Sequence, residues 1–273
     1  MSELGDHSAL ISAIRRNKWR QGAVVSALAV PSQLFPLLDR DKSHWVVLSH
    51  DCDILHHDLE NEPHAEVIAL AVNRLRDGNL LYGKNPRRLQ IQSHAAGHCL
   101  EFHANSRRFI PRRCLADCHP DDAVALSPEQ VQELASWIAR RYVRTAFPDA
   151  FNARLQPINS ELIRVLKRDG EWISGIYVAM EMAELSADQP YDVLMTITML
   201  DQDFSQPDRR SRVQQTCDII EVLVNAQKRA ISIKNIQMLP ESQLNLTDWK
   251  KLRRLEFDYL SAGGESSPAT PRV

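Results

Sequence analysis

The run "WVVLSHDCDILHHD", residues 45–58, decides how the N-terminal half of this chain folds. It begins with four apolar residues and then turns into a mixture of histidine, aspartate and cysteine. A short apolar run of this kind is typical of a buried strand, and the sequence predicts one strand over residues 44–54. Both faces of that strand begin apolar and end polar. We therefore expect the strand to leave the core near residue 49 and to carry its polar groups onto a rim.

The polar end of this strand is the candidate for catalysis. In a strand, side chains two residues apart share a face, so Asp51 and Asp53 would lie about 6–7 Å apart. Two such carboxylates can hold Mg or Mn, or can divide the acid and base roles, with His50 assisting proton transfer. The alternative is that both acids are exposed turn residues, with Asp53 capping the segment that follows. We expect Cys52 to be a simple buried cysteine, because flanking carboxylates disfavour a thiolate.

Zinc is a second alternative for the His- and Cys-rich half of the chain. Cys114 and Cys118 have a spacing that suits half of a structural zinc site, and His119 follows directly. A second pair with tight spacing is missing. The competing interpretation is a set of core cysteines and surface histidines.

Short strands continue on both sides of the opening run and then give way to helices. Six of them at close spacing favour a small barrel over a parallel α/β sheet. A helix is expected from the N-cap Ser127, with an apolar stripe of Val131, Leu134, Trp137, Ile138 and Tyr142. The other predicted strands of the first half are 22–30, 65–72, 87–93, 98–105 and 107–115. The other predicted helices are 8–19, 159–168 and 211–227. Strands are expected at 171–185, 191–200 and 230–239, and a final helix or helix plus strand at 246–260.

These elements predict a mixed fold in which an N-terminal small β-barrel is followed by helices and a C-terminal α+β domain. A length of 273 residues suits two domains rather than a single core. The expected divisions are a barrel domain over 1–125, a helical connector over 126–168, an α+β domain over 169–262 and a disordered tail over 263–273.

Composition narrows the class of protein. Hydrophobic residues make up 44% of the chain, and no apolar stretch approaches the roughly 20 residues of a membrane helix. The N-terminus lacks the apolar core of a signal peptide, so we expect a cytoplasmic protein without a membrane partner. Five cysteines without dense spacing are expected to stay reduced.

Arginine is concentrated between residues 84 and 154, where one lysine and ten arginines face seven acids. Three doublets lie on or beside predicted strands, and aromatic residues are interleaved with them. Such a surface could neutralise phosphates and stack on an unpaired base, which predicts a nucleic-acid partner, RNA or DNA. The alternative is a set of solvated strand edges. The predicted nucleic-acid-binding residues are Arg87, Arg88, Arg107, Arg108, Arg112 and Arg113.

The order of the N-terminal elements resembles PemK/MazF-type toxins, the SH3-like barrel endoribonucleases of toxin–antitoxin systems. The resemblance rests on "RQGAVVSALAV" (20–30), "WVVLSH" (45–50), "EVIALAV" (66–72) and "DAVALSPEQVQELASWI" (122–138). It implies an SH3-like barrel, nuclease activity and an antitoxin or other protein partner. The opening acid and the threonine of that family have no counterpart here. No catalytic residue is therefore carried over.

The sequence leads to two hypotheses about function. The first is a nucleic-acid-cleaving hydrolase of toxin or defence type, with its site at the 49–57 corner and arginine doublets that bind phosphates. The second is a non-enzymatic module that binds nucleic acid or protein, in which the His/Cys corner is structural or binds zinc. Small barrels host both classes, so the fold does not choose between them.

Overall fold

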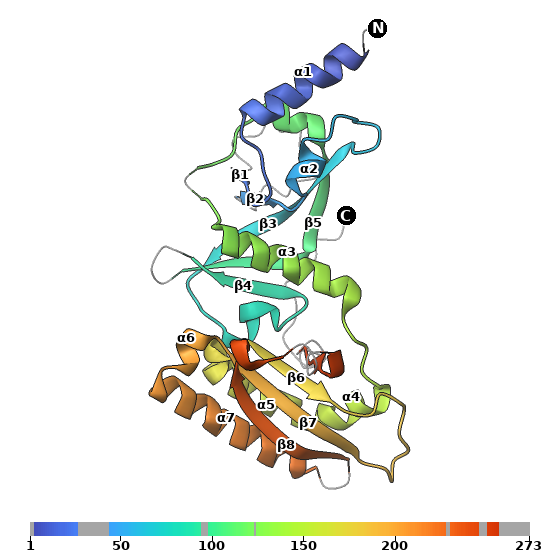
Figure 1. Cartoon of the computed structure of the whole chain (residues 1–273), viewed down its shortest axis with the longest axis vertical. Coiled ribbons are helices and arrows are strands. Elements are labelled where there is room, and N and C mark those ends of the chain that lie inside the picture. The colour runs from blue at the N-terminus through green and yellow to red at the C-terminus, as the bar shows by residue number, and fades with distance from the viewer. Residues whose placement is uncertain are drawn as a thin grey trace, which may run out of the picture. The chain divides into compact units, whose positions relative to one another are not determined.

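The structure is a computed structural model that describes residues 3–26, 44–93, 98–122, 124–227, 230–245 and 250–256. The chain divides into two compact units, each with its own sheet (Figure 1). The first unit is made of residues 1–76 and 87–140, and the second of residues 77–86 and 141–273. The mixed α/β class expected from the sequence is confirmed. The predicted tail 263–273 lies outside the described residues.

The first unit contains a five-stranded antiparallel sheet in the order β1-β2-β3-β5-β4. In the part of the chain that is described, β1 and β4 stay at opposite edges, so the SH3-like barrel is not confirmed. The strands of this unit are β1 (Val24–Ser26), β2 (His44–Val47), β3 (His64–Asn73), β4 (Arg88–Gln92) and β5 (Cys99–Pro111). Its helices are α1 (Glu3–Arg16), α2 (Asp51–Ile54) and α3 (Pro128–Val143), and a 3-10 turn, η2, spans Arg112–Ala116.

Both faces of the interior strand β2 are buried, which explains its apolar run Trp45–Val47. Trp45 packs on one face in a cluster with Ile14 of α1 and Ile54 of α2. Val46 points to the other face, into a cluster with Trp137 of α3. The described part of the first unit is therefore a sheet with helices on both sides.

Helix α3 confirms the helix expected after Ser127. The Ser127 Oγ accepts the backbone N–H of Gln130 at 3.3 Å, and the Gln130 side chain accepts the N–H of Ser127 at 2.8 Å. This reciprocal pair is a capping box that satisfies two helix-end donors. Leu134 and Trp137 of the apolar stripe are buried, but Tyr142 is exposed.

Several strand predictions need correction. The strand predicted over 44–54 ends at Val47, and residues 51–54 form one helical turn instead. The two strands predicted over 98–105 and 107–115 are one strand, β5, followed by the turn η2. Of the strand predicted over 22–30, residues 24–26 form β1, residues 22–23 precede it, and residues 27–30 fall outside the described residues. The expected 8–19 helix is α1, which ends at Arg16.

Strand β5 carries an irregularity that matters for the site. Its partner β3 pairs Ile68 with Arg107 and Leu70 with Phe102, so residues 103–106 lie opposite the single residue Ala69. We call residues 103–106 the β5 bulge. Bulges re-aim side chains and interrupt the regular pairing of a sheet.

The second unit is built on a four-stranded sheet in the order β8-β7-β6-β9. Strands β7 and β8 are parallel and are connected through α7, while β6 pairs antiparallel with β7 and β9. A large apolar core lies between this sheet and helices α4, α5 and α7. The strands are β6 (Gly175–Ala179), β7 (Tyr191–Met199), β8 (Ile231–Pro240) and β9 (Arg253–Arg254). The helices are α4 (Asp149–Leu155), α5 (Asn159–Asp169), α6 (Asp201–Phe204) and α7 (Pro207–Asn225), with 3-10 turns η1 (Gly78–Gly83), η3 (Gln156–Ile158), η4 (Gly170–Trp172) and η5 (Glu241–Gln243).

Residues 77–86 belong to the second unit although they lie between two strands of the first. Lys84 is fully buried, and its ammonium donates to the carbonyls of Gly170 and of Ile173. A Cβ on Gly78 would meet the backbone N of Glu171 at 2.7 Å, so this contact requires glycine. Residues 77–86 are thus a packed part of the second unit.

Gly22 connects the turn before β1 to helix α3, and its replacement gives a testable result. Its φ is +80°, and a Cβ there would lie 2.2 Å from Val131 Cγ2. We expect Gly22→Ala to lower the free energy of unfolding by about 2 kcal/mol in urea denaturation, from positive-φ strain plus the clash. Adding Val131→Ala to this variant should restore the part of the free energy that is lost to the clash, but not the part that is lost to the positive-φ strain. An unchanged free energy of unfolding in Gly22→Ala would contradict this packing.

Candidate functional site

The corner that follows β2 is held by backbone and side-chain hydrogen bonds. Ser49 Oγ accepts the N–H of Glu66 at 2.8 Å, which ties the strand end to β3. His50 is the N-cap of α2, and its Nδ1 accepts the N–H of Cys52 at 3.3 Å. Asp51 Oδ1 accepts the N–H of Gln21 at 2.6 Å. The polar run thus forms a tight turn between β2 and β3.

Arg112, one of the six predicted nucleic-acid-binding arginines, is buried and holds the other side of this corner. Its side chain is fully buried, and its guanidinium donates to the carbonyls of Asp53 at 2.6 Å, Ile54 at 3.3 Å and Asp58 at 3.1 Å. Burial lowers the pKa of Arg112, and the nearby carboxylates of Glu62, Asp58 and Asp53 oppose that shift. The neighbouring Arg113 is exposed.

The predicted catalytic set does not gather as the strand interpretation required. Because residues 51–54 are helical, Asp51 and Asp53 do not share the face of a strand. His50 and Asp51 line a cleft beside the 16–24 turn, whereas Asp53 does not. Across the described residues, no group of three or more His, Cys, Asp or Glu side chains is arranged to hold a metal ion. The shared strand face on which the predicted Mg or Mn site at Asp51 and Asp53 rested is therefore absent.

The zinc alternative is also without a ligand cluster. Cys114 and Cys118 are buried, and Cys118 Sγ donates to the carbonyl of Cys114 at 3.3 Å. Burial raises the pKa of Cys114, and it raises the pKa of Cys118 to about 12. Both thiols therefore remain protonated and pack as apolar side chains. His119 instead lines the cleft.

Two of the arginine doublets meet at the β5 bulge. The backbone N–H of Ala104 donates to the carbonyl of Arg87 at 2.9 Å. Arg107 Nε donates to the carbonyl of Ala104 at 3.1 Å, and Arg108 donates to the carbonyl of Asn105 at 3.2 Å. Arg88 is paired across the strands with His103, the first residue of the bulge. Four of the six predicted nucleic-acid-binding arginines thus surround one feature of the sheet.

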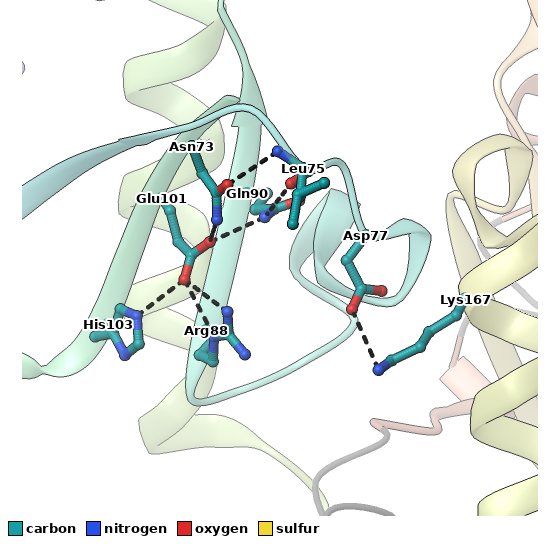
Figure 2. A network of polar contacts seen from close by, with 8 residues as sticks. All are labelled: Asn73, Leu75, Asp77, Arg88, Gln90, Glu101, His103 and Lys167. Carbon is teal, nitrogen blue, oxygen red and sulfur yellow. Dashed lines mark hydrogen bonds and ion pairs between the residues drawn. The ribbon is translucent and has the colours of Figure 1, made fainter. Parts of the chain in front are cut away.

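A polar network beside the bulge was not predicted from the sequence (Figure 2). Its centre is Glu101 on β5, whose Oε1 accepts hydrogen bonds from Arg88 Nη2 at 2.7 Å and from His103 Nε2 at 3.0 Å. The other carboxylate oxygen accepts from Gln90 and Asn73, each at 2.9 Å. Three strands therefore direct four donors at one carboxylate.

The environment of Glu101 fixes its charge. Its side chain is 6% exposed, whereas those of Arg88 and His103 are 45% and 48% exposed. Burial by itself would raise the pKa of Glu101, but the hydrogen bonds from His103, Gln90, Arg88 and Asn73 together hold that pKa well below its usual range. Glu101 is thus a permanent buried anion that orients two half-exposed side chains.

The Glu101–His103 hydrogen bond determines which nitrogen of the imidazole can react. A carboxylate is a pure acceptor, so His103 Nε2 carries the hydrogen in the neutral ring and Nδ1 carries the lone pair. In the part of the chain that is described, Nδ1 makes no hydrogen bond. A half-exposed imidazole oriented by a buried carboxylate can accept a proton from a substrate. Arg88, on the same carboxylate, provides a fixed positive charge beside it.

The sequence contains part of the signal for this network. Alternation along "LEFH" places Glu101 and His103 on one face, and alternation along "RLQ" places Arg88 and Gln90 on one face. The two faces coincide because β4 pairs Gln90 with Glu101 and Arg88 with His103. That register is not readable from either strand alone.

Replacing Glu101 by glutamine should destabilise the first unit by about 2–3 kcal/mol at neutral pH. In the variant, the NH2 group of the new amide would face side-chain donors that hydrogen-bond to the carboxylate in the wild type. Because the folded pKa of Glu101 is depressed, its contribution is present above the unfolded pKa and is lost as pH falls below about 4. The free energy of unfolding, measured in urea at several pH values, should therefore fall less steeply with decreasing pH in Glu101→Gln than in the wild type.

Glu66 offers a matched control for that substitution. It pairs with Arg107 at 3.0 Å, and both side chains are 22% exposed. Glu66→Gln should cost less than about 1 kcal/mol, as partly exposed ion pairs do. Equal losses of unfolding free energy in Glu101→Gln and Glu66→Gln would contradict a special role for the Glu101 network.

No helix within the described ranges is long and apolar enough to span a bilayer. The chain was compared with protein-family models, with curated proteins and with solved structures, and none of them matches it.

Proposed function

We propose that this protein is a nucleic-acid-cleaving enzyme that cuts RNA at the face of β4 and β5. The observation that carries the proposal is the hydrogen bond between Glu101 and His103 beside Arg88. It supplies a proton acceptor, a group that orients it and a positive charge in one place. Phosphodiester cleavage by the internal 2′-hydroxyl of RNA needs these parts and no external nucleophile.

The proposed reaction is a transfer within the substrate. His103 Nδ1 accepts the proton of the 2′-hydroxyl while that oxygen forms a bond to phosphorus. The bond between phosphorus and the 5′-oxygen breaks, and the departing oxygen takes a proton from the imidazolium or from water. Arg88 offsets the negative charge that grows on the phosphoryl oxygens. Glu101 is a positioning residue, since it acts through His103 and Arg88.

Substrate contacts are proposed at the β5 bulge. Arg87, Arg107 and Arg108 lie there and would neutralise neighbouring phosphates. Phe109 is 61% exposed two residues after Arg107 and is available to stack on a base. Phe102, the other aromatic between the arginine doublets, is fully buried and belongs to the core. No step is proposed through a metal at Asp51 and Asp53.

The toxin or defence role and the SH3-like barrel are proposed on the resemblance to PemK/MazF-type toxins. The order of β1, β2, β3 and the later helix α3 supports that resemblance. An antitoxin or other protein partner is part of the same proposal.

The proposal is tested with labelled RNA and DNA of one sequence, incubated with wild-type protein and with Asp53→Asn in excess EDTA. The Asp53 carboxylate makes no hydrogen bond to the described residues, so its loss should leave the fold intact. We expect RNA cleavage by both proteins, products that end in a 2′,3′-cyclic phosphate, and intact DNA. Cleavage that requires Mg or Mn and is lost in Asp53→Asn would instead place the site at the 49–57 corner.

A binding module is the second candidate function, favoured by the arginines around the β5 bulge. It predicts a gel shift of RNA or DNA without cleavage in any buffer. Arg108→Gln should then weaken the shift and reduce its dependence on salt.

A further inference from the structure

The segment Arg16–Arg20 alternates anchored and exposed side chains at the edge of the sheet opposite β4. Asn17 Nδ2 donates to the carbonyls of Leu115, Ala116 and Cys118, and the Trp19 indole donates to those of Leu115 and Cys118. Trp19 is buried, whereas Arg16, Lys18 and Arg20 are exposed. Two fixed side chains thus hold three cations on one turn.

These cations have no partner among the described residues, since their side chains form no hydrogen bond or ion pair there. Lys18 has a φ of +61°, in the left-handed region where glycine is usual at a helix end. Lys18 thus adopts a backbone conformation that is strained for a lysine and would not be strained for a glycine.

The three cations line a cleft of about 940 Å³ together with His50 and His119. That volume is within the range of pockets that hold small ligands. His50 Nδ1 accepts a backbone N–H, so its Nε2 carries the hydrogen in the neutral ring and is a donor.

Acidic side chains also line the cleft, but two of them are already engaged. Asp51 accepts the N–H of Gln21, and Asp121 pairs with His44 at 3.6 Å. Asp122 is exposed at its margin. Arg16, Lys18, Arg20 and His50 can therefore donate hydrogen bonds to an anion with several oxygens, while the three carboxylates keep their negative charge.

We infer that this cleft binds a phosphate-bearing ligand through Arg16, Lys18 and Arg20. The ligand is either a free nucleotide or the terminal phosphate of an RNA strand, because both present the same chemistry. The site lies at the β1–β2 edge of the sheet, and the proposed cleavage site lies at the β4–β5 edge. The inference does not depend on cleavage.

The test is isothermal titration of the full chain, without divalent metal, using pyrophosphate, ATP and an RNA oligomer with a 5′-phosphate or a 5′-hydroxyl. Arg16→Gln/Lys18→Gln/Arg20→Gln should weaken binding at least tenfold. Arg15→Gln is the matched control, because Arg15 is exposed on the same helix but does not line the cleft. Binding of pyrophosphate and ATP would identify a free nucleotide, and binding of the 5′-phosphorylated oligomer alone would identify an RNA end.

Lys18→Gly separates a ligand role from a structural one. Glycine relieves the positive φ, so this variant should melt at a higher temperature and yet bind the same ligand several-fold more weakly. The inference is overturned if no probe binds, if the triple variant binds like the wild type, or if Arg15→Gln weakens binding as much as Arg16→Gln. A lower melting temperature with unchanged binding in Lys18→Gly would remove Lys18 from the site.

Discussion

Replacing His103 by alanine is expected to lower the rate of RNA cleavage about a thousandfold, within the range that a positioned general base contributes. The imidazole is 48% exposed, so the variant should stay folded, with a loss of about 1 kcal/mol for the hydrogen bond that His103 donates to Glu101. Single-turnover cleavage of labelled RNA measures the rate, and circular dichroism verifies the fold.

Two further variants make that result specific. His64 is an exposed histidine at the start of β3, and His64→Ala should cleave at the wild-type rate. Arg88→Ala should also slow cleavage, because it removes the charge next to the reacting phosphate. Equal rates for wild type and His103→Ala would refute the assignment of the base.

Arg112→Met is expected to lower the free energy of unfolding by about 3–5 kcal/mol. The substitution removes all three side-chain hydrogen bonds and leaves the buried carbonyl of Ile54 without its side-chain donor, whereas the carbonyls of Asp53 and Asp58 keep backbone N–H donors. The 53–58 segment should lose protection from hydrogen exchange before the rest of the first unit. Urea denaturation with exchange measured by mass spectrometry tests both effects.

The adjacent residue gives the control. Arg113 is exposed, so Arg113→Met should change stability by less than about 0.5 kcal/mol. If the two variants unfold alike, the corner does not depend on the buried guanidinium.

The corner also illustrates what sequence reasoning could reach. The apolar residues 45–48 correctly predict a buried strand, because a strand that is buried on both faces is apolar at every position. The end of that strand is decided elsewhere: Ser49 binds the N–H of Glu66, and His50 caps a helical turn. Neither contact follows from periodicity, which is why residues 51–54 were wrongly predicted as strand.

Arginine gives a second example. The arginine doublets 87–88, 107–108 and 112–113 cannot be distinguished by their sequence. The structure places the first two around the β5 bulge and buries Arg112 under a segment more than fifty residues earlier in the chain. Such a role depends on carbonyls that only the folded corner brings together. The Glu101 network was missed for the related reason that Asn73, Arg88 and Gln90, three of the four donors, lie on other strands.

The most direct test of the account uses a DNA strand that contains one ribonucleotide, incubated in EDTA with wild-type protein and with His103→Ala. The account predicts that the wild type cuts next to the single ribose and leaves a 2′,3′-cyclic phosphate, and that His103→Ala leaves the strand intact. Cutting at deoxyribose positions, or equal cutting by the two proteins, would contradict a 2′-hydroxyl reaction with His103 as its base.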